Sequence, residues 1–139
     1  MEPETYSIRV LYLPAGDGVT GLVRTIDASG PADYLSQLQR MLDNAYLEEL
    51  DLGVGVKMYL DEHSKDARGL PANPAATRIV HLAGGGLRPD DYITGPVILA
   101  GANGPIAPNG IPLDSAVPAI AFDWCRESGV PFAEDLPQA

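Results

Sequence analysis

Apolar and polar residues alternate in the first part of the chain, with the period of a β-strand that has one face in a core. In TYSIRVLYLP, residues 5–14, every second side chain from Tyr6 to Tyr12 is apolar, and Pro14 ends the pattern. A second run of this kind, LVRTIDA at residues 22–28, follows the turn-forming segment AGDGVTG. Two such runs around a glycine-rich turn predict an antiparallel hairpin.

The spacing of apolar residues then changes to three and four positions, which is typical of an amphipathic helix. The apolar positions are Tyr34, Leu35, Leu38, Met41, Leu42 and Ala45. Ser29 or Gly30 can cap the first turn, and Pro31 suits that turn because its missing N–H would have no helical partner there. We therefore expect one long helix over Pro31–Asn44.

Two more strand-like runs, YLEELDLG at residues 46–53 and GVKMYLDE at residues 55–62, surround Gly53 and Gly55. They predict a second hairpin. Three carboxylates within Leu47–Leu52 favour an edge strand, because charge on an edge deters pairing with other chains.

The stretch GLPANPAAT at residues 69–77 contains the residues of a helix start. Asn73 can act as the N-cap and Pro74 suits the first turn, so we expect a short helix from Pro74 to about Leu82. Glycines follow at positions 84–86, and glycine ends a helix readily because it tolerates the left-handed backbone. The short helix should therefore end at these glycines.

The segment DYITGPVILAG at residues 91–101 predicts a further strand in which Ile98 and Leu99 are buried. Pro96 indicates that this strand lies at a sheet edge or carries a bulge, because proline cannot donate to a ladder. The remainder should form an irregular loop, a C-terminal helix and a tail, at residues 102–112, 113–129 and 130–139.

Together these elements predict an α+β fold. We expect a mainly antiparallel sheet of four to five strands, packed in two layers against the one long helix, with a short helix and a C-terminal helix in addition. The length of 139 residues fits a single domain, 1–139, with its core at about residues 5–101.

The charge balance narrows the classes of partner, because nineteen acidic and nine basic side chains give a formal net charge of -10. The basic residues are scattered, so no direct nucleic-acid binding is expected. A lone Cys125 cannot form an internal disulfide, and no apolar run approaches the ~20 residues of a membrane span. We expect a soluble, cytoplasmic protein with no membrane contact.

Candidate catalytic residues are few, so we expect no enzyme, no cofactor and no metal site. The triplet DEH at Asp61–His63 offers oxygen and imidazole ligands, but neighbours on a strand point to opposite faces. His81 fits the C-terminal end of the short helix, where a positive charge is favourable. Cys125 has the spacing of a buried, inert thiol.

The segment AGGGLR could bind a phosphate through backbone N–H groups with an arginine beside it. It follows a helix and does not open one, so helix termination is the favoured interpretation. The residues of this alternative ligand site are Gly84, Gly85, Gly86 and Arg88.

Two stretches resemble a known family, namely YLDEHSKDARGLPANPAAT at residues 59–77 and DYITGPVILAG after it. With the order of elements, they are similar to the family called domain of unknown function 3846, small proteins carried by phages and plasmids. Its hallmark is a Leu-Pro-x-Asn-Pro step, here at residues 70–74, with an Ala-Thr pair at residues 76 and 77. The resemblance covers about residues 5–101 and implies an accessory protein of a mobile element, with no established reaction.

The leading functional hypothesis is therefore an acidic protein that binds a host protein with a basic surface, for instance one that otherwise binds nucleic acid. The partner-binding residues would be Glu48, Glu49, Asp51, Asp61, Glu62 and Asp66, from the second hairpin and the turn after it. The alternative is a domain that binds or sequesters a small ligand such as a nucleotide signal, at the glycine-rich segment. The oligomeric state stays open.

Overall fold

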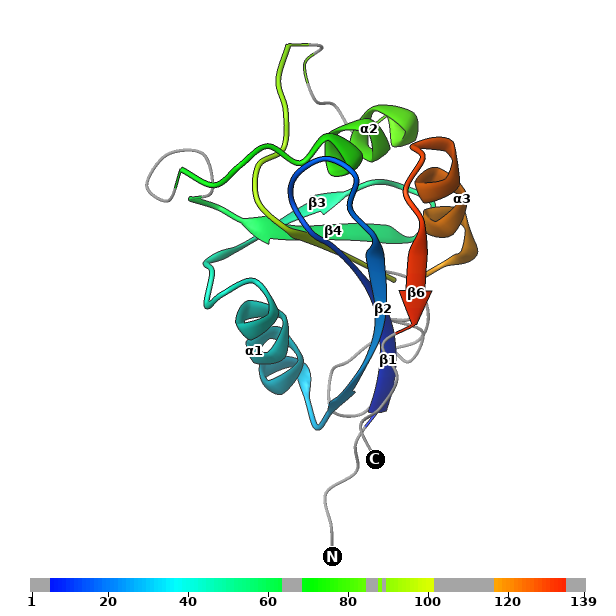
Figure 1. Ribbon diagram of the computed structural model, residues 1–139. Helices are drawn as coiled ribbons and strands as arrows, with labels where there is room; N and C mark the ends of the chain where they lie inside the picture. Colours follow the sequence, from blue (N-terminus) through cyan, green and yellow to red (C-terminus); the bar gives the residue numbers. More distant parts are fainter. Residues whose placement is uncertain (1–5, 64–68, 85–87, 89, 102–116, 135–139) are drawn as a thin grey trace, which may run out of the picture.

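The computed structural model of the chain describes residues 6–63, 69–84, 88, 90–101 and 117–134 (Figure 1). Within these residues, three helices and six strands form an α+β fold, so the predicted fold class is confirmed. The elements are, in chain order, β1 (Tyr6–Leu13), β2 (Gly21–Ala28), α1 (Pro31–Met41), β3 (Leu47–Asp51), β4 (Val56–Asp61), α2 (Pro74–Ala83), β5 (Val97–Gly101), α3 (Ala119–Glu127) and β6 (Phe132–Glu134).

The strands form one mixed sheet in the order β3-β4-β5-β1-β2-β6. Four neighbouring pairs are antiparallel, and β2 pairs with β6 in parallel. The sheet is therefore mainly antiparallel, as predicted, but it has six strands in place of the predicted four to five, and its β6 edge is parallel. The missed strand is β6, a three-residue run in the expected tail, which is too short to show an alternating pattern.

Helices cover both faces of the sheet, so the expected two-layer packing is also wrong. Figure 1 shows α1 on one side of the sheet and α2 with α3 on the other. Consecutive residues of the central strands are fully buried, for example Val10 with Leu11 and Ile98 with Leu99. A strand with both faces covered has an unbroken apolar sequence, which is the pattern of VILAG in β5.

Each face has its own core. On the α1 side, Tyr34, Leu38 and Leu42 pack against the inward residues of β1, β2, β4 and β5. On the other side, α2 and α3 pack against the alternate residues of the same strands. The three helices have similar lengths of 11, 10 and 9 residues. The prediction of one long helix with minor additions is therefore not confirmed.

Several local predictions are confirmed. The hairpins β1–β2 and β3–β4 form as expected, and β3 lies at an edge of the sheet. Asn73 is the N-cap of α2, and Gly84 ends that helix in the left-handed conformation with φ 72°. Gly30 is the N-cap residue of α1, which ends at Met41, three residues before the predicted end.

The prediction from Pro96 of an edge position or a bulge is wrong, because β5 lies inside the sheet between β4 and β1 and its register with both strands is continuous. Pro96 precedes the strand, which begins at Val97, so its missing N–H takes nothing from the ladder. Helix α3 begins at Ala119, later than predicted. The predicted loop 102–112 and the predicted start of the last helix lie outside the described residues.

Candidate functional site

Strand β3 is the exposed element on which the predicted partner site depends. Among the described residues it pairs with β4 alone, in a register that joins Glu49 to Tyr59 and Asp51 to Lys57. The N–H of Leu52 donates to the carbonyl of Val56, so the backbone of Leu52 faces β4. Because the direction of the backbone groups alternates along a strand, Leu50 and Glu48 also face β4. The backbone groups of the residues between them, at positions 47, 49 and 51, therefore point to the outer edge of the sheet.

The six predicted carboxylates do not form one surface. Glu48, Glu49, Asp51 and Glu62 are exposed. Asp61 is only 3% exposed, and its carboxylate accepts a hydrogen bond of 2.9 Å from the N–H of His63. It closes the turn after β4, so the prediction that Asp61 is an exposed partner-binding carboxylate is wrong. Asp66 lies outside the described residues.

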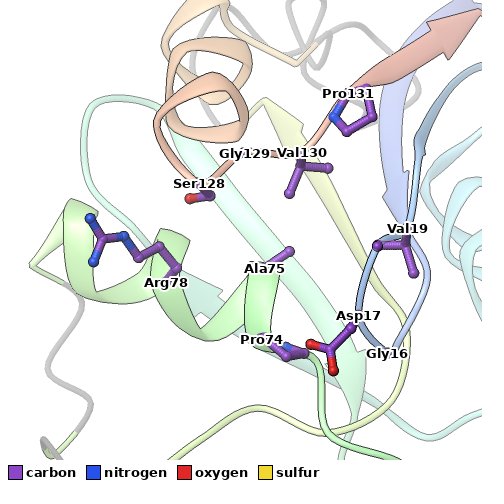
Figure 2. Close-up of a pocket in the computed structure, with 11 residues that line it drawn as sticks. Gly16, Asp17, Val19, Pro74, Ala75, Arg78, Ser128, Gly129, Val130 and Pro131 are labelled. Atoms are coloured by element: carbon purple, nitrogen blue, oxygen red, sulfur yellow. The ribbon is translucent and has the colours of Figure 1, made fainter.

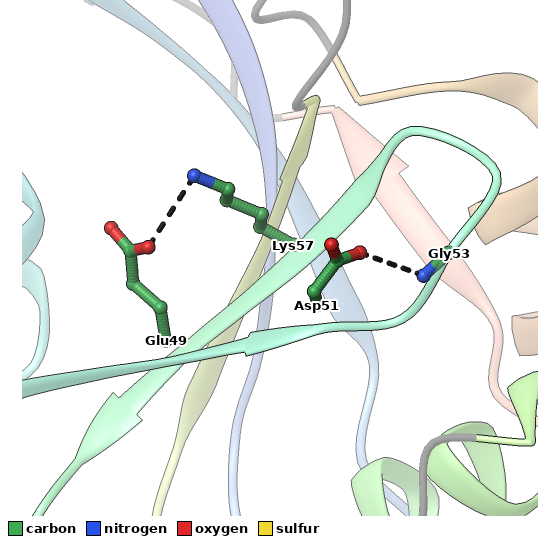
Figure 3. Close-up of polar contacts among 4 residues, drawn as sticks. All are labelled: Glu49, Asp51, Gly53 and Lys57. Carbon is green, nitrogen blue, oxygen red and sulfur yellow. Dashed lines mark hydrogen bonds and ion pairs between the residues drawn. The ribbon is translucent and has the colours of Figure 1, made fainter.

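Two of the exposed carboxylates have partners within the hairpin (Figure 3). The Glu49 carboxylate lies 3.3 Å from the ammonium of Lys57, and the Asp51 carboxylate accepts a 2.9 Å hydrogen bond from the N–H of Gly53. An exposed ion pair of this kind stabilises a fold by at most about 1 kcal/mol. The carboxylates therefore remain able to interact with a cation outside the hairpin.

Glu49 also influences the α1 side of the sheet. Burial raises the pKa of the Tyr59 hydroxyl to about 12, and the charge and hydrogen bond of Glu49 add to this rise. Burial likewise raises the pKa of Tyr34, with smaller contributions from Tyr59 and Glu49. Both hydroxyls stay neutral at physiological pH, so the negative charge beside them comes from Glu49.

Two large apolar side chains flank β3, and sequence reasoning missed both. Tyr46, just before the strand, is 71% exposed, and its ring meets that of His63 edge-on with centroids 5.6 Å apart. Val54, at the tip of the β3–β4 turn, is 63% exposed and has φ 47°. A β-branched residue in this region is strained. The signal in the sequence was a valine between Gly53 and Gly55, in a turn where glycine or asparagine is expected.

The motif around Asn73 has a structural role. The Asn73 side chain is fully buried, and its oxygen accepts a 3.0 Å hydrogen bond from the N–H of Ala76. Its amide nitrogen donates to the carbonyls of Gly95, at 2.9 Å, and Leu13, at 3.4 Å. One side chain thus joins the start of α2 to the chain around β1 and β5, which leaves no polar atom of Asn73 for a ligand.

One end of the alternative ligand site, at Gly84, is the C-terminal end of α2. Gly84 has the left-handed backbone of a C-cap, and its N–H bonds to the carbonyl of His81. Gly85 and Gly86 lie outside the described residues, and Arg88 is exposed. The described part of this segment supports the helix-termination interpretation.

A pocket of about 360 Å³ lies at the other end of α2 (Figure 2). It is formed by the β1–β2 turn, the first turns of α2 and the α3–β6 connection. The lining residues are Gly16, Asp17, Gly18, Val19, Pro74, Ala75, Arg78, Ser128, Gly129, Val130 and Pro131. Asp17 and Arg78 carry opposite charges, and Asn73 already binds the Ala76 N–H at the helix start. The pocket therefore has no preference for one sign of charge.

Two of the remaining candidate features, a metal site and the Cys125 thiol, can be assessed in the described part of the chain. The described residues hold no group of three or more His, Cys, Asp and Glu side chains that could bind a metal ion. Burial raises the pKa of the Cys125 thiol to about 11, although the Arg126 charge opposes this, so the thiolate is scarce at neutral pH. None of the helices in the described part of the chain has the length and apolar character to cross a membrane.

No family model, no curated protein and no solved structure matches the chain. The resemblance to the family called domain of unknown function 3846 therefore stays a prediction.

Proposed function

We propose that the protein is a small acidic accessory protein of a phage or plasmid that binds an extended, basic segment of a host protein at the outer edge of β3. A nucleic-acid-binding protein is the class of host factor whose surface carries such segments. The proposal rests on one observation: an edge strand with outward backbone groups, exposed carboxylates and an exposed apolar side chain at each end.

The backbone of β3 supplies the first part of this argument. An added strand would bond to the outward N–H and C=O groups at positions 47, 49 and 51, which is the mode called β-augmentation. The other residues of β3 already bond to β4, so strand addition would leave the existing ladder unchanged.

Charge supplies the second part. Carboxylates on an edge normally prevent pairing with other chains. A strand that carries Lys or Arg would turn this repulsion into attraction, because opposite charges across neighbouring strands stabilise the pair. Glu48 and Glu49 alternate between the two faces of β3, so cations on either face of the added strand would find a carboxylate.

The flanking apolar residues supply the third part. Aromatic and aliphatic side chains at a contact bury area at low cost in conformational entropy, and charges alone supply little affinity. Tyr46 and Val54 lie just outside the two ends of β3, which gives an added strand an apolar contact at each end.

Hydrogen exchange measured by NMR tests this mode with a peptide of alternating lysine and valine. The amides of Glu49 and Asp51 should gain protection on peptide binding, whereas those of Glu48 and Leu50, which already bond to β4, should not change. A peptide of alternating glutamate and valine is the control for charge. Protection that is uniform along β3, or absent, would contradict strand addition.

Two substitutions at Glu49 separate the contribution of its backbone N–H to peptide binding from that of its side-chain charge. Glu49→Pro removes an outward N–H that the β3–β4 ladder does not use, and proline is tolerated at such an edge position. We expect it to weaken peptide binding at least about tenfold, or ~1.4 kcal/mol, and more than Glu49→Gln does. The variant Asp17→Asn with Glu127→Gln removes two exposed charges elsewhere and is the matched control.

Affinity purification from a host lysate then tests the biological partner. A basic protein recovered by the wild type and by the Asp17→Asn, Glu127→Gln control, but lost with Glu49→Pro, would support the proposal. A partner recovered equally by all three would place the interface elsewhere.

A further inference from the structure

A second hollow lies on the opposite part of the sheet, under α3. Its volume is about 340 Å³, which is within the range of small-molecule sites. The lining residues are Arg9 of β1, Val23 of β2, Phe132 of β6, and Ala119, Phe122, Asp123 and Arg126 of α3. None of these elements takes part in the β3 edge, so the two surfaces are independent.

Aromatic rings form one wall of this hollow. Phe122 and Phe132 are the two phenylalanines of the chain, and their ring centroids lie 4.7 Å apart with a tilt of 53°. Neither side chain is fully buried, although both pack against the core under α3. The hollow therefore offers apolar ring surface to a flat group of a ligand.

Two guanidinium groups lie beside the rings. The Arg126 guanidinium is 5.3 Å from the centre of the Phe132 ring, and Arg9 lines the same hollow from β1. In a chain with a net charge of -10, most of the surface repels anions, so two arginines at one hollow attract anions locally, as Arg24 and Arg40 do at a hollow on the other face of the sheet. Arg126 also pairs with Asp123 at 2.8 Å, but both side chains are more than 60% exposed. Such a pair is weak and an anion can compete with it.

We propose that this hollow binds a small ligand that joins a planar ring to an anionic group, of which a nucleoside monophosphate is representative. The ring lies against Phe122 and Phe132, where stacking and apolar burial stabilise it. The anion lies between Arg126 and Arg9, where a guanidinium can donate two parallel hydrogen bonds to phosphate or carboxylate oxygens. The Asp123 carboxylate then accepts a hydrogen bond from a hydroxyl or amino group of the ligand.

Calorimetric titration with AMP, adenosine and inorganic phosphate tests the two halves of the ligand separately. We expect a dissociation constant for AMP of about 1 mM or tighter, with adenosine and phosphate each at least tenfold weaker. Phosphate that binds as tightly as AMP would overturn the role of the rings. Adenosine that binds as tightly would overturn the role of the arginines, and no AMP binding would overturn the proposal as a whole.

Variants locate the binding in this hollow. Arg126→Gln and Phe132→Leu should each weaken AMP binding at least about fivefold. Phe132→Leu could loosen β6. If the melting temperature of Phe132→Leu falls, the variant of the exposed Arg126, Arg126→Gln, decides the outcome. Arg24→Gln, in β2 at a hollow on the α1 side of the sheet, is the matched control and should bind AMP like the wild type. Equal binding by Arg126→Gln and the wild type would overturn the assignment, and neither result depends on the β3 edge.

Discussion

At the scale of single residues, Asn73 illustrates how a local signal acquires a larger role in the fold. Its sequence context predicts a helix cap, and loss of a cap costs about 1 kcal/mol. In the structure the same side chain also donates to the carbonyls of Gly95 and Leu13, inside the protein. A buried group left without its partner costs about 1 to 3 kcal/mol. Asn73 therefore contributes as a link between elements as well as a cap.

Substitution of Asn73 by alanine should lower the free energy of unfolding by about 3 kcal/mol. The loss of the two donated hydrogen bonds adds to the loss of the helix cap. Urea denaturation measures this loss. A decrease of only about 1 kcal/mol would mean that the two donated hydrogen bonds contribute little.

Asn73→Asp is the companion variant, because a carboxylate keeps the cap acceptor and loses the donors. The buried carboxylate faces two carbonyl oxygens, so its folded pKa should rise above the value of about 3.9 in the unfolded chain. The stability of the variant relative to wild type should therefore be greatest below pH 4 and fall as the pH rises through the folded pKa. A variant whose relative stability is independent of pH would contradict this environment.

At the scale of elements, the β3–β4 hairpin combines a predicted turn with an unpredicted strain. Gly53 and Gly55 adopt positive φ, as glycine does readily, but Val54 between them does so too. The left-handed backbone costs an L-residue about 1 to 2 kcal/mol, and a β-branched side chain is least suited to it. The hairpin therefore keeps an exposed apolar side chain at a cost in stability, which fits a contact residue.

Val54→Asn should raise the free energy of unfolding by about 1 kcal/mol, because asparagine tolerates this backbone. The same variant should bind the lysine-valine peptide more weakly, because it removes the apolar contact. Thermal unfolding and peptide titration on one preparation measure both effects. Greater stability with unchanged binding would remove Val54 from the proposed interface, and lower stability would contradict the strain.

At the scale of the whole molecule, buried neutral groups set the response to alkaline pH. Burial raises the pKa of Cys125 from 9.0 to about 11 and that of Tyr59 from 10.0 to about 12. Each group binds its proton more tightly in the folded state, so its contribution to stability is complete below the unfolded pKa. That contribution is lost as the pH rises through the folded pKa. Stability should fall between pH 9 and pH 12.

Cys125→Ala tests this response. The variant should be less stable than wild type at pH 7, because it removes a buried sulfur atom. Between pH 9 and pH 11, its free energy of unfolding should nevertheless fall by roughly 2 kcal/mol less than that of the wild type. Chemical denaturation across this range measures the difference, and parallel pH profiles for the two proteins would contradict the burial of the thiol.

The candidate sites show where prediction from sequence ended. The carboxylates of β3 were found because Glu48, Glu49 and Asp51 are close in the chain and on an edge strand. The burial of Asp61 was missed, since it depends on the turn after β4 and on the hydrogen bond from His63. The hollow under α3 was missed because Arg9 and Arg126 lie 117 positions apart in the sequence. They line one hollow only because α3 packs near β1 in the folded chain.

The sequence by itself determined the local elements: both hairpins, the amphipathic α1, the start of α2 at Asn73 and its end at Gly84. These follow from side-chain periodicity and from the backbone preferences of proline, asparagine and glycine, which act within a few residues. The tertiary structure alone decided that helices cover both faces of the sheet, that β5 lies inside it and that β6 joins β2 in parallel. Those features depend on contacts between segments far apart in the chain, where burial and strand pairing outweigh local preference.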